Sequence, residues 1–162
     1  MNENIFDKSF LWHDGKGNHA LFEDIIEEIE NHTVLNGRVY LGCDSQIHGE
    51  SCIFVTTICI HGGELMGGRY YFRKELLKDY GGITLRQRIN EEVSRAVSIF
   101  LHLVETIPEI DAEIHIDIGR TARSKTRYFV DSITGWLTGL GASYKIKPDA
   151  WAAASVADKH TK

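Results

Sequence analysis

The stretch RVYLGCDSQ, residues 38–46, begins with β-branched and aromatic side chains and ends with an aspartate, a serine and a glutamine. Its first part predicts a buried β-strand over residues 38–44, because Val, Tyr and Leu favour a pleated, packed surface. An aspartate that ends such a strand is either a turn former or a functional residue. Asp44 is therefore the first candidate for chemistry.

Two further strands follow and predict an antiparallel meander. SCIFVTTICI occupies residues 51–60, and Gly62-Gly63 leads into GRYYF at residues 68–72. Short turns that contain glycine join antiparallel neighbours. Before the first strand, ALFEDIIEEIEN at residues 20–31 places isoleucines on one face and acids on the other, which predicts an amphipathic surface helix.

The second half of the chain alternates predicted helices and strands. The longest helix is predicted over residues 83–105, with Thr84 as its N-cap and a continuous apolar stripe. AEIHIDIG, residues 112–119, alternates isoleucine with polar side chains and predicts a fourth strand. A helix over 125–137, a short strand over 143–146 and an alanine-rich helix over 149–160 complete the order β-β-β-α-β-α-β-α.

The long helix predicts the direction of the fourth strand. A crossover between strands of one sheet makes the fourth strand parallel to the first. Asp44 and Asp117 both end their strands, so parallel neighbours would bring the two carboxylates together at the edge where open α/β sheets bind ligands. Adjacent carboxylates repel each other, which favours a bound cation. Oxygen ligands indicate Mg²⁺ or Mn²⁺ rather than zinc.

Two further acids are candidates for the same site. Glu92 lies at the margin of the apolar stripe and points toward the sheet, whereas Glu91 is rotated by about 100° onto the polar side. In the last helix Asp158 shares a face with Trp151, and Asp149 stands at the helix start, where a carboxylate suits the helix dipole. We expect Glu92 as the third ligand and Asp158 as the fourth, with Asp149 as the alternative.

A basic segment follows Asp117 directly. RTARSKTR, residues 120–127, carries four positive charges and no acid, and is predicted to form a loop and a first helical turn. Backbone N–H groups in such a place favour phosphate. The predicted phosphate-binding residues are Arg120, Arg123, Lys125, Arg127 and Lys147, with Lys145 beside them. No aromatic ladder is interleaved, so contacts to a nucleic-acid backbone are favoured over base stacking.

Composition limits the class of protein. The chain has 162 residues, 43% of them hydrophobic, which is enough for one compact domain over residues 1–162. The net charge of −5 argues against general adhesion to nucleic acid. That charge is uneven, because residues 1–31 hold eight acids and two lysines, whereas residues 119–162 hold eight basic residues and three acids. A local contact with an anion is therefore compatible with an acidic chain.

Other sequence features point away from membranes and zinc. No window approaches a membrane span, and the first residues lack the order of a signal peptide, so we expect a cytoplasmic protein. The three cysteines lack Cys-x-x-Cys spacing and are expected to be reduced core residues. The histidines show no zinc spacing on a helix, and we expect His115 to be a hydrogen-bonded core residue. HDGKGN, residues 13–18, lacks the glycine pattern of a phosphate loop and receives no role.

Four phrases resemble the YkuK-type ribonuclease H-like family of the ribonuclease H superfamily: GCDSQ, TLRQRINEEV, IHIDIG and KPDAWAAASVADKHTK, which span residues 42–162. The family more often has threonine where this chain has Cys43. The resemblance implies a five-stranded mixed sheet flanked by helices, with residues 1–36 as an N-terminal extension that contains one helix. It also implies a metal-dependent phosphodiester site, and its residues would be Asp44, Glu92, Asp117 and Asp158. Resolvase-like relatives take the last aspartate from the start of the closing helix, here Asp149.

Such a site implies a nuclease with two metal ions about 3.5 to 4 Å apart, one activating a water and the other stabilising the leaving 3′ oxygen. Asp44 would bridge the ions, with Glu92 and Asp117 on one and Asp158 on the other. The adjacent Lys159 or His160 would assist proton transfer or hold phosphate. The sequence leaves open whether the substrate is RNA, DNA or a hybrid, whether cleavage is internal or terminal, and the oligomeric state.

Other interpretations stay open at this point. The chain could be a non-catalytic ribonuclease H-like module that binds nucleic acid or a protein, or a phosphoesterase for small nucleotides. Glu92 could instead pair with Arg88 or Arg95 across a helical turn. The basic segment could be a solvated loop. Ser45 and Gln46 are expected to satisfy local backbone groups.

Overall fold

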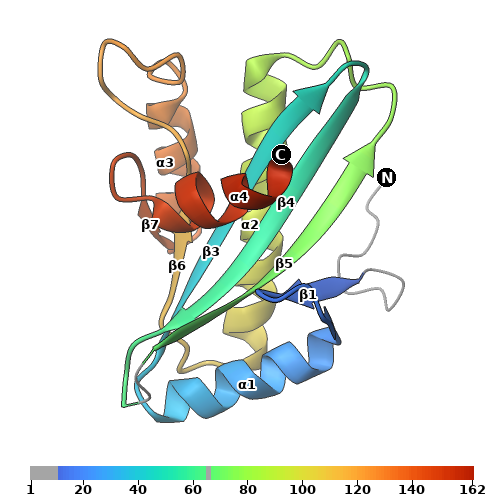
Figure 1. Cartoon of the computed structure of the whole chain (residues 1–162). Helices are drawn as coiled ribbons and strands as arrows, with labels where there is room; N and C mark the ends of the chain where they lie inside the picture. The colour runs from blue at the N-terminus through green and yellow to red at the C-terminus, as the bar shows by residue number, and fades with distance from the viewer. Residues whose placement is uncertain (1–10, 65–66) are drawn as a thin grey trace.

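One mixed sheet of seven strands runs through the part of the chain that the computed structural model describes, residues 11–64 and 67–162 (Figure 1). The spatial order of its strands is β2-β1-β5-β4-β3-β6-β7. The strands are β1 Trp12–Asp14, β2 His19–Ala20, β3 Arg38–His48, β4 Ser51–His61, β5 Gly68–Leu77, β6 Ala112–His115 and β7 Ser143–Lys145.

The predicted antiparallel meander is confirmed. β3 pairs with β4 from Arg38 opposite His61 to His48 opposite Ser51, and β4 pairs antiparallel with β5. β3 extends four residues past its predicted end at Asp44. It extends because β4 offers a partner at every position as far as the tight turn at residues 49–50. Asp44 therefore lies within the strand and not at its end.

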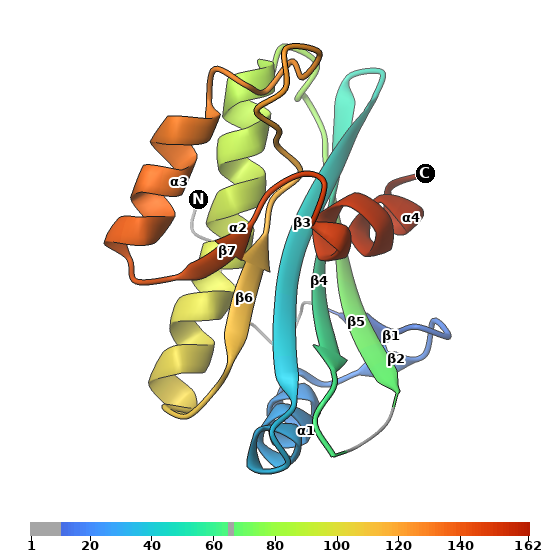
Figure 2. The same cartoon turned by 90° about the vertical axis from the view of Figure 1, so that its left-hand side faces the viewer.

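The fourth predicted strand, β6, is parallel to β3, as the crossover required. Val39 pairs with Ala112 and Gly42 with His115, and pairing ends there. Figure 2 shows β3 continuing past the arrowhead of β6. Because β3 runs on while β6 leaves the sheet, the two segments separate at the level of Asp44 and Asp117. This separation opens the space in which the candidate site lies.

The expectation of five strands is wrong, because the hairpin β1–β2 adds two more at the edge of β5. The hairpin lies in the segment HDGKGN and its neighbours, for which no role was predicted. Asp14 Oδ1 accepts hydrogen bonds from the backbone N–H groups of Lys16 and Asn18 and so shapes the turn. Strands of three and two residues are too short to show an alternating pattern. The extension over residues 1–36 thus contains a hairpin as well as a helix, and its residues 1–10 lie outside the described ranges.

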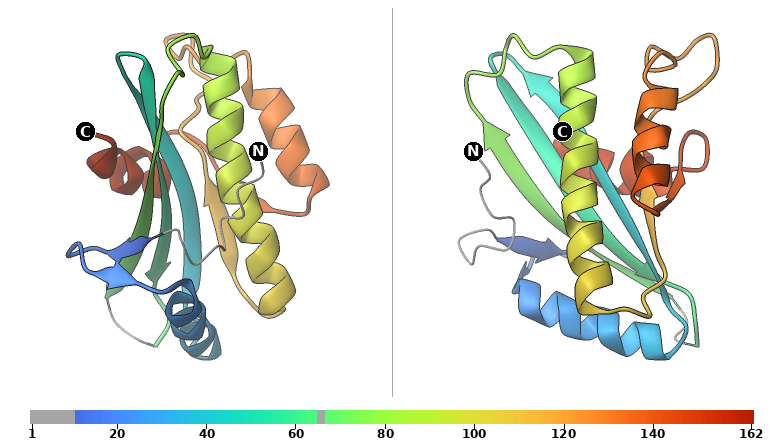
Figure 3. Two further views of the ribbon diagram at one scale, coloured as in Figure 1. Left: turned by 90° about the vertical axis from the view of Figure 1, so that its right-hand side faces the viewer. Right: turned by 180° about the vertical axis from the view of Figure 1, so that it is seen from behind.

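Helices cover both faces of the sheet (Figure 3). The α-helices are α1 Phe22–Val34, α2 Leu85–Thr106, α3 Val130–Gly139 and α4 Asp158–Thr161, and a π-helical segment, η1 Ala152–Ala157, precedes α4. α2 and α3 lie on one face, and η1 and α4 cross the other. The helix predicted over residues 125–137 starts later, at Val130, because residues 120–129 form a loop. None of the helices among the described residues combines the length and apolar character needed to cross a bilayer.

Helix α2 has the start and the buried stripe that its sequence predicts. Thr84 is its N-cap, and its hydroxyl accepts from Gln87 N while the Gln87 side chain accepts from Thr84 N, a reciprocal capping box. The helix buries its apolar stripe against the core side chains of β3 and β6, such as Leu41 and Ile114. Each such side chain that is fully buried contributes roughly 1.5–3 kcal/mol. This packing fixes the helix face on which Glu92 lies.

On the opposite face the last helical segment closes directly onto β3. A Cβ at Gly42 would lie 2.6 Å from Ala153 N and 2.7 Å from Ala152 C, so a glycine is required for this approach. Ala152 N donates to His115 Nδ1 at 3.1 Å, and His115 Nε2 lies 2.9 Å from Glu113. Burial lowers the pKa of His115. His115 is therefore a hydrogen-bonded core residue, as expected, and it fixes the start of η1.

Candidate functional site

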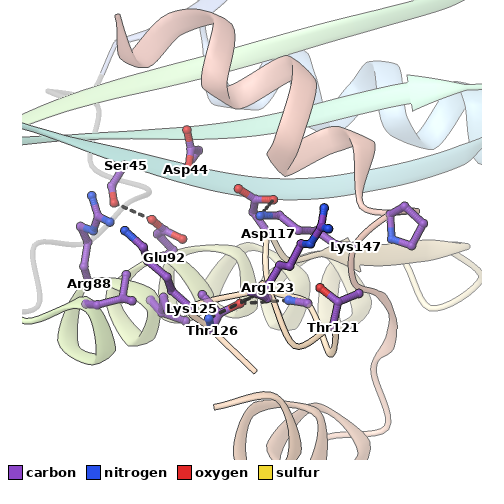
Figure 4. A pocket seen from close by; sticks show the side chains of 15 residues that line it. Asp44, Ser45, Arg88, Glu92, Asp117, Thr121, Arg123, Lys125, Thr126 and Lys147 are labelled. Carbon is purple, nitrogen blue, oxygen red and sulfur yellow. Dashed lines mark hydrogen bonds and ion pairs between the residues drawn. The ribbon is translucent and has the colours of Figure 1, made fainter. Parts of the chain in front are cut away.

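Three of the four predicted carboxylates, Asp44, Glu92 and Asp117, line one cavity of about 620 Å³ (Figure 4). The cavity lies where β3 and β6 separate, between the start of α2 and the loop after Asp117. Its remaining lining residues are Ser45, Leu85, Arg88, Ile89, Gly119, Thr121, Arg123, Ser124, Lys125, Thr126, Lys147 and Pro148.

Asp44 and Asp117 stand at equal height on neighbouring chain segments. Each lies two residues beyond the last parallel pair, Gly42 and His115. Burial, and after it the negative charge of Asp117, raise the pKa of Asp44 to about 7. Asp44 and Asp117 thus line one cavity and repel each other there. A cation between them would relieve this repulsion.

Asp158 approaches Asp44 from the other face of the sheet. Its charge and a side-chain hydrogen bond also raise the pKa of Asp44. Asp158 is not one of the residues that line the cavity, and it is 44% exposed and paired with Lys162 at 3.3 Å. Asp149, the alternative candidate, is exposed and does not line the cavity either. Of the two aspartates, Asp158 is the one that contacts the cluster.

Glu92 comes to the cavity from α2 and is 7% exposed. Ser45 Oγ donates a hydrogen bond to its Oε1 at 2.5 Å. The pKa of Glu92 is raised to about 8, mainly by burial and also by the charges of Asp44 and Asp117, whereas the Ser45 hydrogen bond and the charge of Arg88 oppose the rise. The expectation that Ser45 satisfies local backbone groups is wrong, because its hydroxyl is committed to this carboxylate.

The alternative that Glu92 pairs with Arg95 is also wrong. Arg95 forms ion pairs with Glu75 at 3.2 Å and with Glu91 at 2.7 Å. No ion pair between Glu92 and Arg88 occurs within the described residues, although Arg88 lines the same cavity. The carboxylate of Glu92 is therefore available inside the cavity.

Three of the five predicted phosphate-binding residues line the cavity, namely Arg123, Lys125 and Lys147. Arg120 instead pairs with Asp131 at 2.8 Å, and Arg127 donates to Ala122 O and to Tyr128 Oη. The structure therefore divides the basic segment into cavity residues and surface residues. The sequence of the basic segment does not indicate which of its residues line the cavity and which lie on the surface.

Arg88 is a fourth cavity cation, which sequence reasoning treated solely as a partner of Glu92. It precedes Glu92 by one helical turn, a spacing that could have identified it as a neighbour in the site. Hydroxyl groups were missed too. Thr126 Oγ1 accepts from Gly119 N at 3.0 Å and lies 2.8 Å from Ser124 Oγ, which holds the loop in its compact form.

His160, which was expected to assist proton transfer or hold phosphate beside Asp158, packs against aromatic side chains. Its ring stacks on Phe72 with centroids 3.8 Å apart, and its Nε2 lies 3.1 Å from Tyr70 Oη. Both partners belong to β5. His160 therefore contacts aromatic side chains of the sheet, where it anchors α4 and the adjacent Asp158.

The donor set of the site fits a hard divalent cation. Its ligand atoms are carboxylate oxygens, and Asp117 Oδ1 is buried with no hydrogen bond from the described residues. Among residues 11–64 and 67–162, no three Asp, Glu, His or Cys side chains lie together as a ready-made metal cage. Mg²⁺ needs no such cage, because it binds through one or two carboxylates and completes its shell with water and phosphate oxygens. Asp44, Glu92 and Asp117, with Asp158 behind Asp44, are the residues that would hold it.

A mixed sheet with a parallel central pair, helices on both faces and carboxylates at the separating strands defines a ribonuclease H-like protein. The family model described as Ribonuclease H-like matches residues 20–162, and the chain belongs to this family. It is 25% identical over an alignment of 173 residues to the protein named "Uncharacterized protein YkuK" of Bacillus subtilis (strain 168), with 95% of this chain and 98% of that protein covered. No solved structure matches the chain. The resemblance to the YkuK-type family is confirmed.

Proposed function

We propose that this protein is a nuclease that hydrolyses phosphodiester bonds of a nucleic acid with Mg²⁺ or Mn²⁺. The observation that carries the proposal is the shared cavity, whose lining includes both the carboxylates Asp44, Glu92 and Asp117 and the cations Arg88, Arg123, Lys125 and Lys147. Carboxylates that hold a metal and cations that hold phosphate are the two parts that hydrolysis of a phosphodiester needs. Membership of the ribonuclease H-like family supports the same reaction class.

Burial disfavours the charged forms of the carboxyl groups in the cavity, and this would favour the binding of a cation. The pKa of Asp44 is raised to about 7 and that of Glu92 to about 8, so without a cation both groups hold protons near neutral pH. A divalent ion favours their charged forms and releases these protons. Asp44, Glu92 and Asp117 would hold ions that could supply an activated water and stabilise the leaving oxygen. Ser45 and the packing of α2 hold Glu92 in place for this role.

The cavity cations act on the substrate backbone. Arg88 comes from α2, Arg123 and Lys125 from the loop after Asp117, and Lys147 from the segment after β7. Cations from these three segments would hold the phosphates that flank the cleaved bond. Contacts of this kind are independent of sequence, so the proposal is cleavage without strong base specificity.

A degradation assay tests the proposal. Labelled single strands, duplexes and RNA–DNA hybrids are incubated with the full chain and Mn²⁺, and with EDTA as the metal-free control. We expect Mn²⁺-dependent cleavage that falls by roughly 10²-fold or more in Asp44→Asn and Asp117→Asn. Asp149→Asn removes an exposed carboxylate outside the cavity and should keep full activity. Cleavage that survives Asp44→Asn, or that needs no metal, would contradict the proposal.

A second candidate function is a non-catalytic module that binds nucleic acid through the same cavity. The lack of a three-ligand metal cage among the described residues favours it. It requires the four cavity cations and not the carboxylates. In the same assay it predicts retention of the labelled strands without cleavage, with binding that improves in Asp117→Asn because a negative charge beside the cavity cation Lys147 has been removed.

A further inference from the structure

The backbone of Lys147 is fixed beside the segment that carries Asp117. Lys147 N donates to Ile118 O at 2.8 Å, and Ile116 N donates to Lys145 O at 3.0 Å. These two bonds continue the parallel pairing of β6 and β7 beyond the ends of both strands. The Lys147 side chain therefore starts next to Asp117.

The ammonium of Lys147 lies on the Asp117 carboxylate. Lys147 Nζ is 3.2 Å from Asp117 Oδ1, the buried oxygen that receives no hydrogen bond from the described residues. The Asp117 side chain is 27% exposed, whereas the Lys147 side chain is 48% exposed. The charged end of Lys147 can therefore leave the carboxylate for solvent or substrate, while the carboxylate remains in the cavity.

Lys147 differs in this respect from the other cavity cations. Within the described residues, Arg88, Arg123 and Lys125 form no ion pair with a carboxylate of the cluster. A lysine is a compact point charge on a flexible stem, which suits exchange between two anionic partners. A metal ion on Asp117 and an ammonium 3.2 Å from the same carboxylate carry the same sign of charge and repel each other.

We propose that Lys147 is an internal counter-ion of Asp117, which a divalent cation displaces and which then pairs with a phosphate of the substrate. The inference rests on the proposed function and adds a coupling between metal binding and phosphate binding. Metal binding releases Lys147 for phosphate, and phosphate draws Lys147 away from the metal ligand. Linkage is reciprocal, so each partner must raise the affinity for the other by the same factor.

Calorimetric titration with Mn²⁺ tests the inference on the full chain. Lys147→Met keeps the length of the stem and removes its charge, and Lys147→Gln is a second neutral variant with a polar end. Lys78→Met is the matched control, because Lys78 is exposed and does not line the cavity. We expect both Lys147 variants to bind Mn²⁺ at least about fivefold more tightly than the parent protein, at the low end of coupling between sites. Lys78→Met should bind Mn²⁺ as the parent does.

A second measurement follows the coupling itself. The affinity for a phosphorothioate oligonucleotide, measured by fluorescence anisotropy, should rise on saturation with Mn²⁺ by a larger factor in the parent protein than in Lys147→Met. Equal or weaker Mn²⁺ binding by the Lys147 variants, with Mn²⁺ binding lost in Asp117→Asn, would overturn the inference and leave the proposed function standing. Failure of the parent and of both Lys147 variants to bind Mn²⁺ would overturn both. Circular dichroism establishes that each variant is folded.

Discussion

Ser45 Oγ donates a hydrogen bond to Glu92 Oε1 and so joins the central strand β3 to helix α2 inside the candidate site. Ser45 follows Asp44 in the chain, and successive residues of a strand point to opposite faces. The strand therefore presents Asp44 on the side of α4 and supports Glu92 on the side of α2. One dipeptide sets the positions of two carboxylates.

The Ser45 hydrogen bond predicts a shift in the pH dependence of the site. The bond favours the charged form of Glu92, so Ser45→Ala raises the pKa of Glu92 further above about 8. A hydrogen bond to a charged group contributes about 1.5–3 kcal/mol, which corresponds to about one to two pH units. We expect the pH at which half-maximal Mn²⁺ affinity is reached to rise by that amount in calorimetric titrations. Ser94→Ala, at an exposed position of the helix that carries Glu92, is the control. An unshifted pH profile of Mn²⁺ affinity in Ser45→Ala would show that the bond does not act on Glu92.

The raised pKa values predict that the metal-free protein is less stable at higher pH. Asp44 and Glu92 have folded-state pKa values of about 7 and about 8, above the ordinary values of 3.8 and 4.5. Between pH 4 and 8 the folded chain therefore binds more protons at these groups than the unfolded chain does. Stability falls as pH rises wherever the folded state binds more protons. Thermal unfolding in EDTA should show a Tm that declines from pH 5 to pH 8.

Two variants test whether these carboxyls cause the decline. Glu92→Gln keeps a hydrogen-bond acceptor for Ser45 but cannot ionise, so its Tm should decline less steeply with pH. Asp149→Asn, at an exposed position, should leave the slope unchanged. Saturating Mn²⁺ should raise the Tm most at pH 8, where the carboxyls are most easily freed of protons. A Tm that rises steadily from pH 5 to pH 8 in EDTA would contradict the prediction.

The close approach at Gly42 predicts a large effect from a single methyl group. In Gly42→Ala the new Cβ would meet the backbone of Ala152 and Ala153, which cannot rotate away as a side chain can. We expect a loss of about 1–3 kcal/mol or more, measured by urea unfolding. Gly135→Ala in α3 meets nothing within 4 Å and should stabilise the protein by roughly 0.5–1 kcal/mol. Comparable effects of the two changes would mean that η1 does not pack against β3.

Salt dependence separates the cavity cations from the surface cations. Each phosphate contact that is removed lowers the slope of log affinity against log salt by about 0.7 for single strands and about 0.9 for duplexes. Arg88→Gln and Arg123→Gln should each lower the slope by this amount in anisotropy titrations. Arg120→Gln should not, because Arg120 pairs with Asp131 outside the cavity. The opposite ranking would place the nucleic acid on the surface part of the basic segment.

Patterns that involve many residues predicted the fold well. The alternation in IHIDIG and the length of the helix before it predicted the parallel pairing of β3 and β6, and with it the equal height of Asp44 and Asp117. The N-cap at Thr84 was predicted as well, because it depends on residues close in sequence. Periodicity and topology are properties of whole segments, so a single atypical residue does not change the structure that they predict.

Contacts between single distant residues could not be predicted. The bond from Ser45 to Glu92 depends on the exact rotation of α2 over β3, and the division of the basic segment depends on how the loop closes through Thr126. The hairpin β1–β2 was missed because its pairing partner, β5, lies far along the chain. These features follow from tertiary packing, for which a single sequence carries little local signal.

The parallel pairing of β3 with β6 has a consequence for synthesis on the ribosome. The meander β3–β4–β5 can pair as it emerges, but one edge of β3 stays bare until α2 and then β6 have been translated. Exposed strand edges in a nascent chain are prone to aggregate. Destabilising substitutions in β6 should therefore reduce the yield of folded protein and increase its dependence on chaperones. They should not give a folded but inactive protein.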